Sequence, residues 1–430
     1  MKKSMLSEIE KAIRDEISAS VALEHVKYLC SIGDRFVGTD GDKKAFEYII
    51  KKFQEFGLQI DKTKICVPSF RERRCSLSIV EPVKREFKVL SAYFSPATPP
   101  EGVTGQLEYL GDGEEEDYKE KDVKGKIVVL KEKDFENLKF WMGRYARLAR
   151  IHGALGIVLI HVMPWPYRCS LEIGNNSIEN RFFKEQVPVV TISCTDGQDL
   201  MYLLGKGNVV GTLKVDTEVK EASSFVIRGT LKGSEYPDEK ISIIAHRDNG
   251  VAPGANDNGS GTATMLIIAE CLSKRKPKRS IEFISSTAEE GVTAGALQYV
   301  NAHENEIKHV KALFNIDMIA TGGPLNLVDI GIWPDCPPLA HSKELNKLVE
   351  DIAHELGYSL RRMISSRGVS DSGRFIEKGV PSVWFWKPDD PYYHSELDSP
   401  ERIDPNMMKI LGDIVAITVW RLANMDRLPV

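Results

Sequence analysis

The sequence contains few cysteines, and none of them falls in a paired motif. Seven cysteines occur in 430 residues, and no two have the CxxC spacing. An odd, scattered set argues against a disulfide framework and against a zinc site built from thiolates. We therefore expect a reducing, cytoplasmic location. One bridge, between Cys66 and Cys75, stays open because these two residues are close in sequence.

Long apolar runs and an excess of charge of one sign are also missing. The longest apolar stretches, such as LGIVLI, are far shorter than the about 18 residues that a membrane span needs. The 57 basic and 62 acidic side chains give a net charge of -5, which does not favour binding to nucleic acid or to an anionic membrane. Charged and apolar residues alternate at helical spacing in the first 21 residues, so we expect an amphipathic helix there rather than a signal peptide.

The second half of the chain alternates strand-like and helix-like segments. ISIIA, SIEFIS and KALFNI have the apolar character of buried strands, and a helix is expected from Gly261 to Ser273. This alternation predicts an α/β fold with a mostly parallel mixed sheet and helices on both faces. A helix from about Asp42 to Phe56, followed by Gly57 as its C-terminal cap, adds to the same domain.

The region between these segments, residues 69–222, has a different sequence pattern. Short strand-like pieces alternate with turns, one helix is expected from about Leu138 to His152, and the acidic stretch 111–120 has the character of a surface turn. The sequence therefore predicts a discontinuous domain of residues 1–68 and 223–430. A smaller, β-rich domain of residues 69–222 is inserted into it.

Side chains that bind metals follow several of the expected strands. In chain order they are His246, Asp257, the pair Glu289 and Glu290, Asp317, and His394. Ligands of open α/β sheets gather at the carboxyl ends of the strands, so these side chains are expected to meet at one edge. Two histidines with several carboxylates and no cysteine suit zinc or a similar divalent ion.

Each of these residues also has an ordinary structural explanation. A histidine after a strand is often only hydrogen-bonded, GANDNGSG has the composition of a surface turn, and adjacent glutamates often begin a helix. Asp317 is more specific, because an aspartate between apolar residues needs a positively charged partner. If these residues bind a metal, Asp248 orients the ring of His246. One glutamate of the pair is then a ligand, and the other accepts a proton.

Charge counting favours two ions over one. Asp257, Glu290 and Asp317 carry three negative charges, which two zinc ions and a bridging hydroxide would balance. Two such ions lie about 3.5 to 4 Å apart and can share one carboxylate. We expect Asp257 to be this bridge.

The motifs HRD, PGANDNGSG, AEEG, NIDM and YYH, in this order, resemble those of the co-catalytic di-zinc aminopeptidases, which are related to transferrin receptor and glutamate carboxypeptidase. DRFVGTDG and HSELDSPERID extend the resemblance over nearly the whole chain. In the middle, DVKGKIVVL, HGALGIVLI and VPVVTISCTDGQDL resemble the protease-associated domain inserted in many of these enzymes.

The resemblance implies a ligand set and a mechanism. One zinc is held by His246, Asp257 and Asp317, and the other by Asp257, Glu290 and His394. Glu289 is the general base for a hydroxide activated by the two ions. Tyr393 either steadies the developing oxyanion or is a packed aromatic side chain. A cis peptide bond is implied between Asp257 and Asn258.

Two features depart from the family pattern. In EEGVTAGA the turn glycine is displaced and Ala296 replaces the usual serine, which affects the start of the following helix but no ligand. PSVWFW lacks the arginines that glutamate-specific relatives carry, so acidic side chains are not expected as substrates. Asp371 is a candidate for binding the substrate's amino group, although an aspartate at this position is also typical of a helix cap.

Together these features predict a di-zinc aminopeptidase acting on peptides with a free amino terminus. Co2+ or Mn2+ could replace zinc, and a homo-oligomer is compatible with the sequence. A dipeptidase, a carboxypeptidase, a single-zinc aminoacyl cyclase and a receptor-like binding protein remain as alternatives on the same fold.

Overall fold

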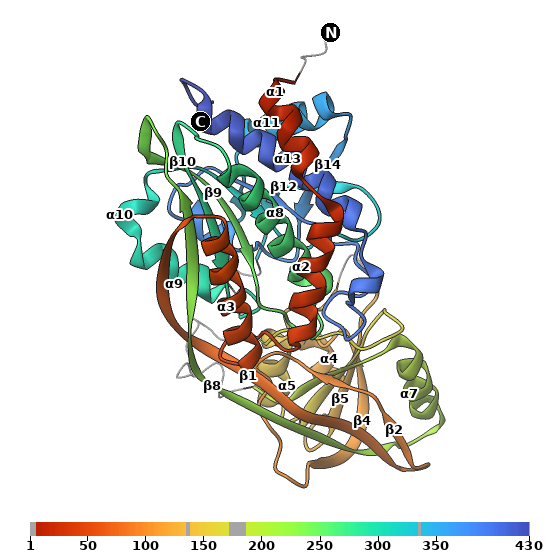
Figure 1. Cartoon of the computed structure of the whole chain (residues 1–430). Coiled ribbons are helices and arrows are strands. Elements are labelled where there is room, and N and C mark those ends of the chain that lie inside the picture. Colours follow the sequence, from red (N-terminus) through yellow and green to blue (C-terminus); the bar gives the residue numbers. More distant parts are fainter. Residues whose placement is uncertain (1–5, 135–137, 172–185, 292, 334–336, 430) are drawn as a thin grey trace. The chain divides into compact units, whose positions relative to one another are not determined.

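The chain forms two compact units in a computed structural model, which describes residues 6–134, 138–171, 186–291, 293–333 and 337–429. Unit 1 comprises Met1–Val67 and Ser223–Val430, and unit 2 comprises Pro68–Ala222. Pro68 thus falls in unit 2 and not, as expected, in the discontinuous domain. Strands β1 (Gln59–Glu81) and β8 (Val210–Leu231) each begin in one unit and end in the other (Figure 1).

Unit 1 is built on a mixed sheet whose central strands are parallel. β9 (Tyr236–His246) lies between β10 (Arg279–Ser286) and β11 (Val310–Ile316), and β11 also pairs with β15 (Ser382–Phe385). Antiparallel or outer partners complete the sheet: β8 beside β10, β12 (Leu325–Gly331) beside β15, and β13 (Leu339–Ala340) and β14 (Leu360–Ser365) beside β12. The predicted α/β fold class is confirmed.

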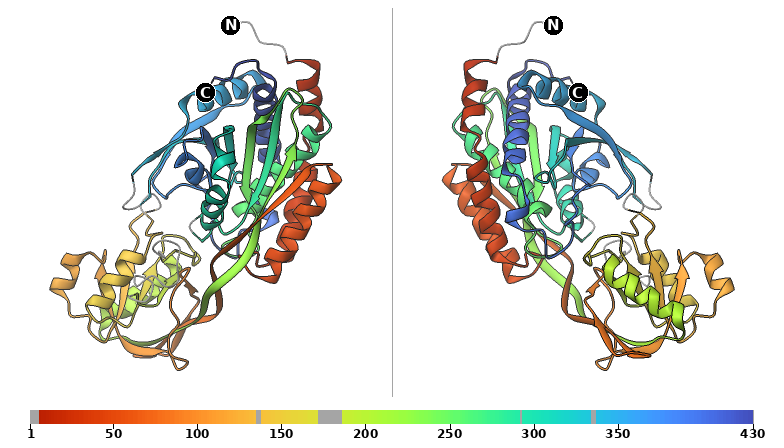
Figure 2. Two further views of the ribbon diagram at one scale, coloured as in Figure 1. Left: turned by 90° about the vertical axis from the view of Figure 1, so that its left-hand side faces the viewer. Right: turned by 90° about the vertical axis from the view of Figure 1, so that its right-hand side faces the viewer.

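Helices cover both faces of this sheet, as Figure 2 shows. They are α1 (Glu8–Glu16), α2 (Ala19–Ile32), α3 (Asp40–Glu55), α8 (Gly261–Ser273), α9 (Ala294–Ala302), α10 (Glu304–Ile307), α11 (Lys343–Leu356), α12 (Ser372–Ile376) and α13 (Pro405–Asn424). Phe314 of β11 lies in the apolar core that α8 and α13 share with the strands. Its neighbour Asn315 points the other way, since side chains alternate along a strand, and it donates to Ser372 Oγ of α12.

The N-terminal segment forms two helices instead of the single expected one. Ser7 and Glu10 form a capping box at the start of α1, which ends at Glu16 with Ile17 as its C-cap. Ser18 then caps α2 by accepting a hydrogen bond from the Val21 N–H. Serine competes well as an N-cap, which explains why a continuous amphipathic pattern is divided at this residue.

Unit 2 is a smaller α/β unit rather than a purely β-rich one. Its strands β4 (Val103–Gly111), β5 (Ile127–Lys131), β6 (Gly156–Ile160) and β7 (Val189–Ile192) are parallel neighbours in this order. β2 (Arg85–Phe87), β3 (Leu90–Ser91), α4 (Glu115–Glu120), α5 (Gly143–Ile151) and α7 (Cys194–Lys206) complete it. The acidic stretch expected to be only a turn therefore contains the short helix α4.

The described cysteines are all free thiols, including Cys66 and Cys75. These two lie in the same extended strand, β1, nine residues apart, so a bridge between them is not formed. Cys336 lies outside the described residues. Within the described residues, no helix combines the length and hydrophobicity needed to cross a bilayer.

Candidate metal centre

Three parallel strands deliver polar side chains to one edge of the unit 1 sheet. His246 is the last residue of β9, and its partner in the neighbouring strand is Ser286, the last residue of β10. Asp317 directly follows β11, and the glutamate pair begins three residues after Ser286. Asp257 lies in the connection between β9 and α8, and His394 follows β15. The predicted convergence at the carboxyl ends of the strands is present.

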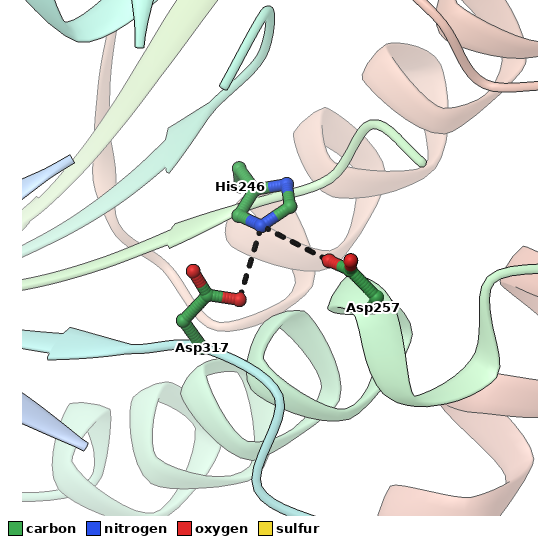
Figure 3. Close-up of side chains that lie close together, drawn as sticks. All are labelled: His246, Asp257 and Asp317. Atoms are coloured by element: carbon green, nitrogen blue, oxygen red, sulfur yellow. Dashed lines mark hydrogen bonds and ion pairs between the residues drawn. The ribbon is translucent and has the colours of Figure 1, made fainter. Parts of the chain in front are cut away.

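One buried group consists of His246, Asp257 and Asp317 (Figure 3). The Nε2 atom of His246 lies 3.2 Å from Asp317 Oδ1 and 3.5 Å from Asp257 Oδ1. In Figure 3 both carboxylates point toward the same ring nitrogen, one from the end of β11 and one from the turn before α8.

A second buried group consists of Asp257, Glu290 and His394. The Nε2 atom of His394 lies 3.0 Å from Asp257 Oδ2 and 3.1 Å from Glu290 Oε2. Asp257 therefore belongs to both groups, and each of its oxygens faces a different histidine. This is the arrangement that a bridging carboxylate requires.

The residues of both groups fit divalent cations. Ligands about 2.0 to 2.2 Å from a tetrahedral zinc ion are themselves separated by roughly 3.3 to 3.6 Å, close to the separations of these nitrogen and oxygen atoms. The electrostatics of the buried carboxylates also favour bound cations. Burial, and then the nearby Glu290, raise the pKa of Asp257 to about 7. The raised pKa shows that too little positive charge surrounds this carboxylate to stabilise its ionised form. Bound cations would provide that charge.

The neighbouring carboxylates raise the pKa values of both histidines. Burial alone lowers the pKa of His394, but Glu290 and Asp257 outweigh it and raise this pKa to about 10. For His246, burial is likewise outweighed by Asp317 and Asp248, and its pKa lies well above the usual value. Both shifts record the surplus of negative charge around the two rings.

Asp248 lies behind His246, as expected. Its Oδ1 atom is 3.3 Å from Nδ1 of the ring, on the side away from the metal-facing nitrogen. Its Oδ2 atom accepts a hydrogen bond from the Glu290 N–H at 3.3 Å. One carboxylate thus contacts the His246 ring of the first group and the backbone of Glu290 in the second.

Glu289 is half-buried beside the first group. Ala288 before it has the left-handed backbone angle φ = 59°, which turns the chain sharply after the strand. Burial raises the pKa of Glu289 well above its usual value, His246 opposes this effect, and Asp317 and Asp371 add to it. The side chain is therefore placed among the residues of the site, and its role as general base stays a prediction.

Tyr393 packs directly on a ligand candidate. Its ring stacks on that of His394 with 3.8 Å between the centroids, and it lies against an apolar cluster that includes Met318, Trp384 and Trp386. Burial, and then Asp257, raise the pKa of its phenol well above the usual value. Packing is thus part of its role, and hydrogen bonding to an oxyanion stays a prediction.

Asp371 is fully buried near the first group. Ser286 Oγ donates a hydrogen bond to its carboxylate. Burial raises its pKa to about 7, against the opposing effect of His246. It occupies the N-cap position of α12, as that alternative expects, but its side chain makes no capping hydrogen bond. Its role toward a substrate amino group stays a prediction.

Sequence reasoning missed two buried arginines that hold the ligand-bearing loops. Arg35, in DRFVGTDG, donates to the carbonyl oxygens of Arg247, Pro253 and Gly254 at 2.7 to 2.9 Å. Arg247 in turn donates to Asp42 Oδ1 at 3.0 Å. The motif itself was visible in the sequence, but its partners lie more than 200 residues away and carry no local signal.

The turn around the shared aspartate is fixed by its neighbours. The peptide bond between Asp257 and Asn258 is cis, which confirms that expectation. The Asn258 side chain donates to the Ile316 carbonyl at 2.9 Å and accepts from the N–H groups of Gly261 and Met318. The turn is thereby tied to the end of β11, next to Asp317.

Comparison with known proteins places this site in a family. Residues 227–419 match the family model of Peptidase family M28. Aminopeptidase YwaD of Bacillus subtilis (strain 168) is 26% identical over 414 residues, covering 93% of this chain and 83% of that protein. Carboxypeptidase Q of Xenopus laevis is 26% identical over 420 residues, covering 93% and 85%.

Solved structures of aminopeptidases are also similar to the chain over nearly its whole length. BSAP, a zinc aminopeptidase from Bacillus subtilis, superposes with a TM-score of 0.75 at 27% identity, covering 96% of this chain and 97% of that one. The aminopeptidase from Aneurinibacillus sp. strain AM-1 gives a TM-score of 0.74 at 25% identity, covering 97% of both chains. Residues 227–419, which include all the ligand candidates, therefore match peptidase family M28, and the whole chain is similar to zinc aminopeptidases of known structure.

Proposed function

We propose that this protein is a two-zinc aminopeptidase that removes N-terminal residues from peptides. The observation that carries the proposal is Asp257, whose two carboxylate oxygens face two separate buried groups of ligand residues. His246 and Asp317 complete one group, and Glu290 and His394 complete the other. All five expected ligands are present and buried, which argues against a receptor-like protein that has lost its metals.

The chemistry divides between the ions and the side chains. Two divalent ions held by these residues would make an attacking water easier to deprotonate and would polarise a carbonyl group. Glu289 accepts the proton from the attacking water and passes it to the leaving amine, for which its raised pKa and half-buried position suit it. Asp248 keeps the His246 ring oriented, and the Tyr393 hydroxyl donates to the oxyanion.

Residual charge favours an amino group over a carboxylate at the substrate end. Six acids contribute to the site: Asp248, Asp257, Glu289, Glu290, Asp317 and Asp371. When two divalent cations are bound and all six acids are ionised, six negative charges against four positive charges leave the site negative. A protonated amino terminus is attracted by such a site, and a terminal carboxylate is repelled. The zinc aminopeptidase relatives support the same choice.

The side-chain preference follows from the apolar cluster beside the site. Met318 directly follows Asp317 and Tyr393 directly precedes His394, so both are chain neighbours of ligands. Both contribute to the cluster that includes the stacked pair Trp384 and Trp386. These apolar side chains favour substrates with an apolar N-terminal residue over substrates with an acidic one.

The test is a substrate panel combined with metal analysis. Leucyl p-nitroanilide, its N-acetylated form and N-blocked peptides with a free carboxylate would be compared for wild type, Glu289→Gln and the control Glu270→Gln, a change near the far end of α8. We expect two zinc equivalents in all three proteins, no cleavage of blocked substrates, and a loss in kcat of about 10²- to 10⁴-fold for Glu289→Gln only.

Two results would contradict the proposal. Cleavage of N-blocked peptides from their carboxyl end would assign the chain to the carboxypeptidase branch, to which Carboxypeptidase Q belongs by name. A fully loaded protein that cleaves none of the substrates would favour a binding function.

The proposal also covers the inserted unit, the cellular location and the oligomeric state. We infer that unit 2 is a protease-associated domain, supported by its motifs and by its compact division from unit 1. The free cysteines support a reducing, cytoplasmic setting. A homo-oligomer is part of the same proposal and is tested by light scattering.

A further inference from the structure

Asp398 is a buried acid that belongs to neither group of ligands. It is 3% exposed and lies four residues after His394. Its Oδ1 atom accepts the Asn256 N–H at 2.7 Å, and its Oδ2 atom accepts the Asp257 N–H at 2.9 Å. Its own carbonyl oxygen accepts the Ala255 N–H at 3.1 Å. Three consecutive N–H groups therefore converge on this one residue.

The segment that Asp398 holds is the one that carries the shared carboxylate. Asp257 must direct one oxygen toward His246 and the other toward His394, which leaves its backbone little freedom to rotate. A hydrogen bond to the N–H of Asp257 itself is the most direct way to fix this orientation. Because its two oxygens each accept one of two neighbouring N–H groups, the carboxyl group of Asp398 holds both donors at once.

The same residue is rigidly attached to His394. The Asp398 N–H donates to the Ser395 carbonyl at 3.2 Å, and Ser395 Oγ donates to the Tyr392 carbonyl at 2.7 Å. His394 lies inside this compact turn with φ = 49°. A displacement of Asp398 would therefore displace His394 and Asp257 together.

We propose that Asp398 is a positioning residue that sets the shared carboxylate Asp257 relative to His394, and so sets the affinity of the site for its second metal ion. The inference rests on the proposed two-ion site. It deepens that proposal, because it assigns to one carboxylate the coupling between the loop before α8 and the loop after β15.

Asparagine at this position is the informative replacement. It has nearly the same shape as aspartate, but it offers one acceptor oxygen and one amide group, and the amide would meet an N–H donor. The matched control is Asp413→Asn on α13. Asp413 is also a buried aspartate, but it pairs with Lys409 and accepts from Tyr358, and so does not touch the ligand loops.

The experiment measures metal binding, not only activity. Wild type, Asp398→Asn and Asp413→Asn would be freed of metal and titrated with Co2+ by calorimetry and by visible absorption, with the thermal unfolding of each metal-free protein recorded in parallel. We expect Asp398→Asn to bind the second equivalent about 10- to 100-fold more weakly and to change the Co2+ absorption bands. Asp413→Asn should lower the unfolding temperature but keep the wild-type affinities and spectrum.

The outcomes separate the two proposals. If wild type binds fewer than two equivalents, the two-ion function fails. If wild type binds two and Asp398→Asn matches it in both affinity and spectrum, the role of Asp398 is refuted while the function stands. Should Asp398→Asn not fold, Asp398→Glu keeps a carboxyl group in a shifted position and is expected to give an intermediate affinity. Wild-type affinity in that variant, with a wild-type spectrum, would also overturn the inference.

Discussion

Both units of the chain place an acid and a histidine at the carboxyl ends of parallel strands, yet only one of these sites has the properties of a metal centre. In unit 2, Glu132 directly follows β5 and His161 directly follows β6. Their side chains are completely buried and hydrogen-bonded to each other. Glu132 also accepts from the Tyr167 hydroxyl at 3.2 Å and from the N–H groups of Lys139 and Val162.

The difference lies in the balance of charge and of hydrogen bonds. In unit 2 one carboxylate meets one imidazole, and donors from the same unit saturate the carboxylate oxygens. In unit 1 four carboxylates (Asp248, Asp257, Glu290 and Asp317) contact two histidines. Such a surplus of buried negative charge is unfavourable unless cations are bound. The position of a side chain at the end of a strand therefore identifies candidate ligands. The balance of charge then distinguishes a metal site from a structural pair of an acid and a histidine.

The largest effect is expected for Asp257→Asn, which removes a charge from both groups of ligands. Metal analysis should show fewer than two equivalents, and the metal-dependent stabilisation of unit 1, about 4 kcal/mol for free metal at 1,000 times its Kd, should largely disappear. Differential scanning calorimetry with and without a chelator measures this change. The unfolding of unit 2 should not respond to the chelator in either protein. Retention of two tightly bound ions would contradict the bridging role.

A somewhat smaller effect is expected for Glu132→Gln in unit 2. Replacing the Glu132 carboxylate weakens its buried hydrogen bond with His161, and losing a hydrogen bond to a charged group typically costs about 1.5 to 3 kcal/mol. Urea unfolding and amide hydrogen exchange should show this loss in unit 2, with metal content unchanged. Asp199→Asn is the control, because the exposed Arg85–Asp199 pair contributes less than about 1 kcal/mol. Loss of metal from Glu132→Gln would show that the two sites do not differ as described.

The strand pattern was sufficient to predict that three residues of the site converge, and the family resemblance supplied the two ligand groups. ISIIA, SIEFIS and KALFNI correspond to the ends of β9, β10 and β11, so the convergence of His246, Glu289 and Asp317 followed from the rules of parallel sheets. The helix from Gly261 to Ser273 was predicted with its observed bounds. These features depend on local patterns, which a sequence displays directly.

Tertiary partners could not be found in the same way. Arg35 and Asp398 act through backbone groups more than 100 residues away, and backbone groups are the same in every sequence. The boundary between α1 and α2 was missed because a capping serine interrupts an otherwise continuous apolar pattern. Unit 2 was expected to be β-rich because its strands are short and apolar, whereas their parallel pairing is a property of the assembled sheet.

The effect that is smallest at neutral pH, because it develops only as the pH falls, concerns buried histidines of unit 1 that pair with hydroxyl groups, whereas His161 pairs with a carboxylate. His25 Nδ1 lies 2.6 Å from the Tyr48 hydroxyl, and His341 Nε2 lies 3.1 Å from Ser372 Oγ. Burial lowers the pKa of each to about 4; Lys52 adds to the effect at His25, and Glu55 opposes it, as Asp329 does at His341.

Because these folded-state pKa values lie below the unfolded value of about 6.5, the unfolded chain takes up protons first as the pH falls. Stability is therefore complete above pH about 6.5 and is lost toward pH about 4, by up to roughly 3 kcal/mol for each histidine. Urea titrations of the metal-loaded protein at several pH values measure this slope. His25→Gln should remove about half of the slope that the two histidines cause, while Glu132→Gln in unit 2 should leave it in place. An unchanged slope in His25→Gln would show that the neutral buried ring does not limit the acid stability of unit 1.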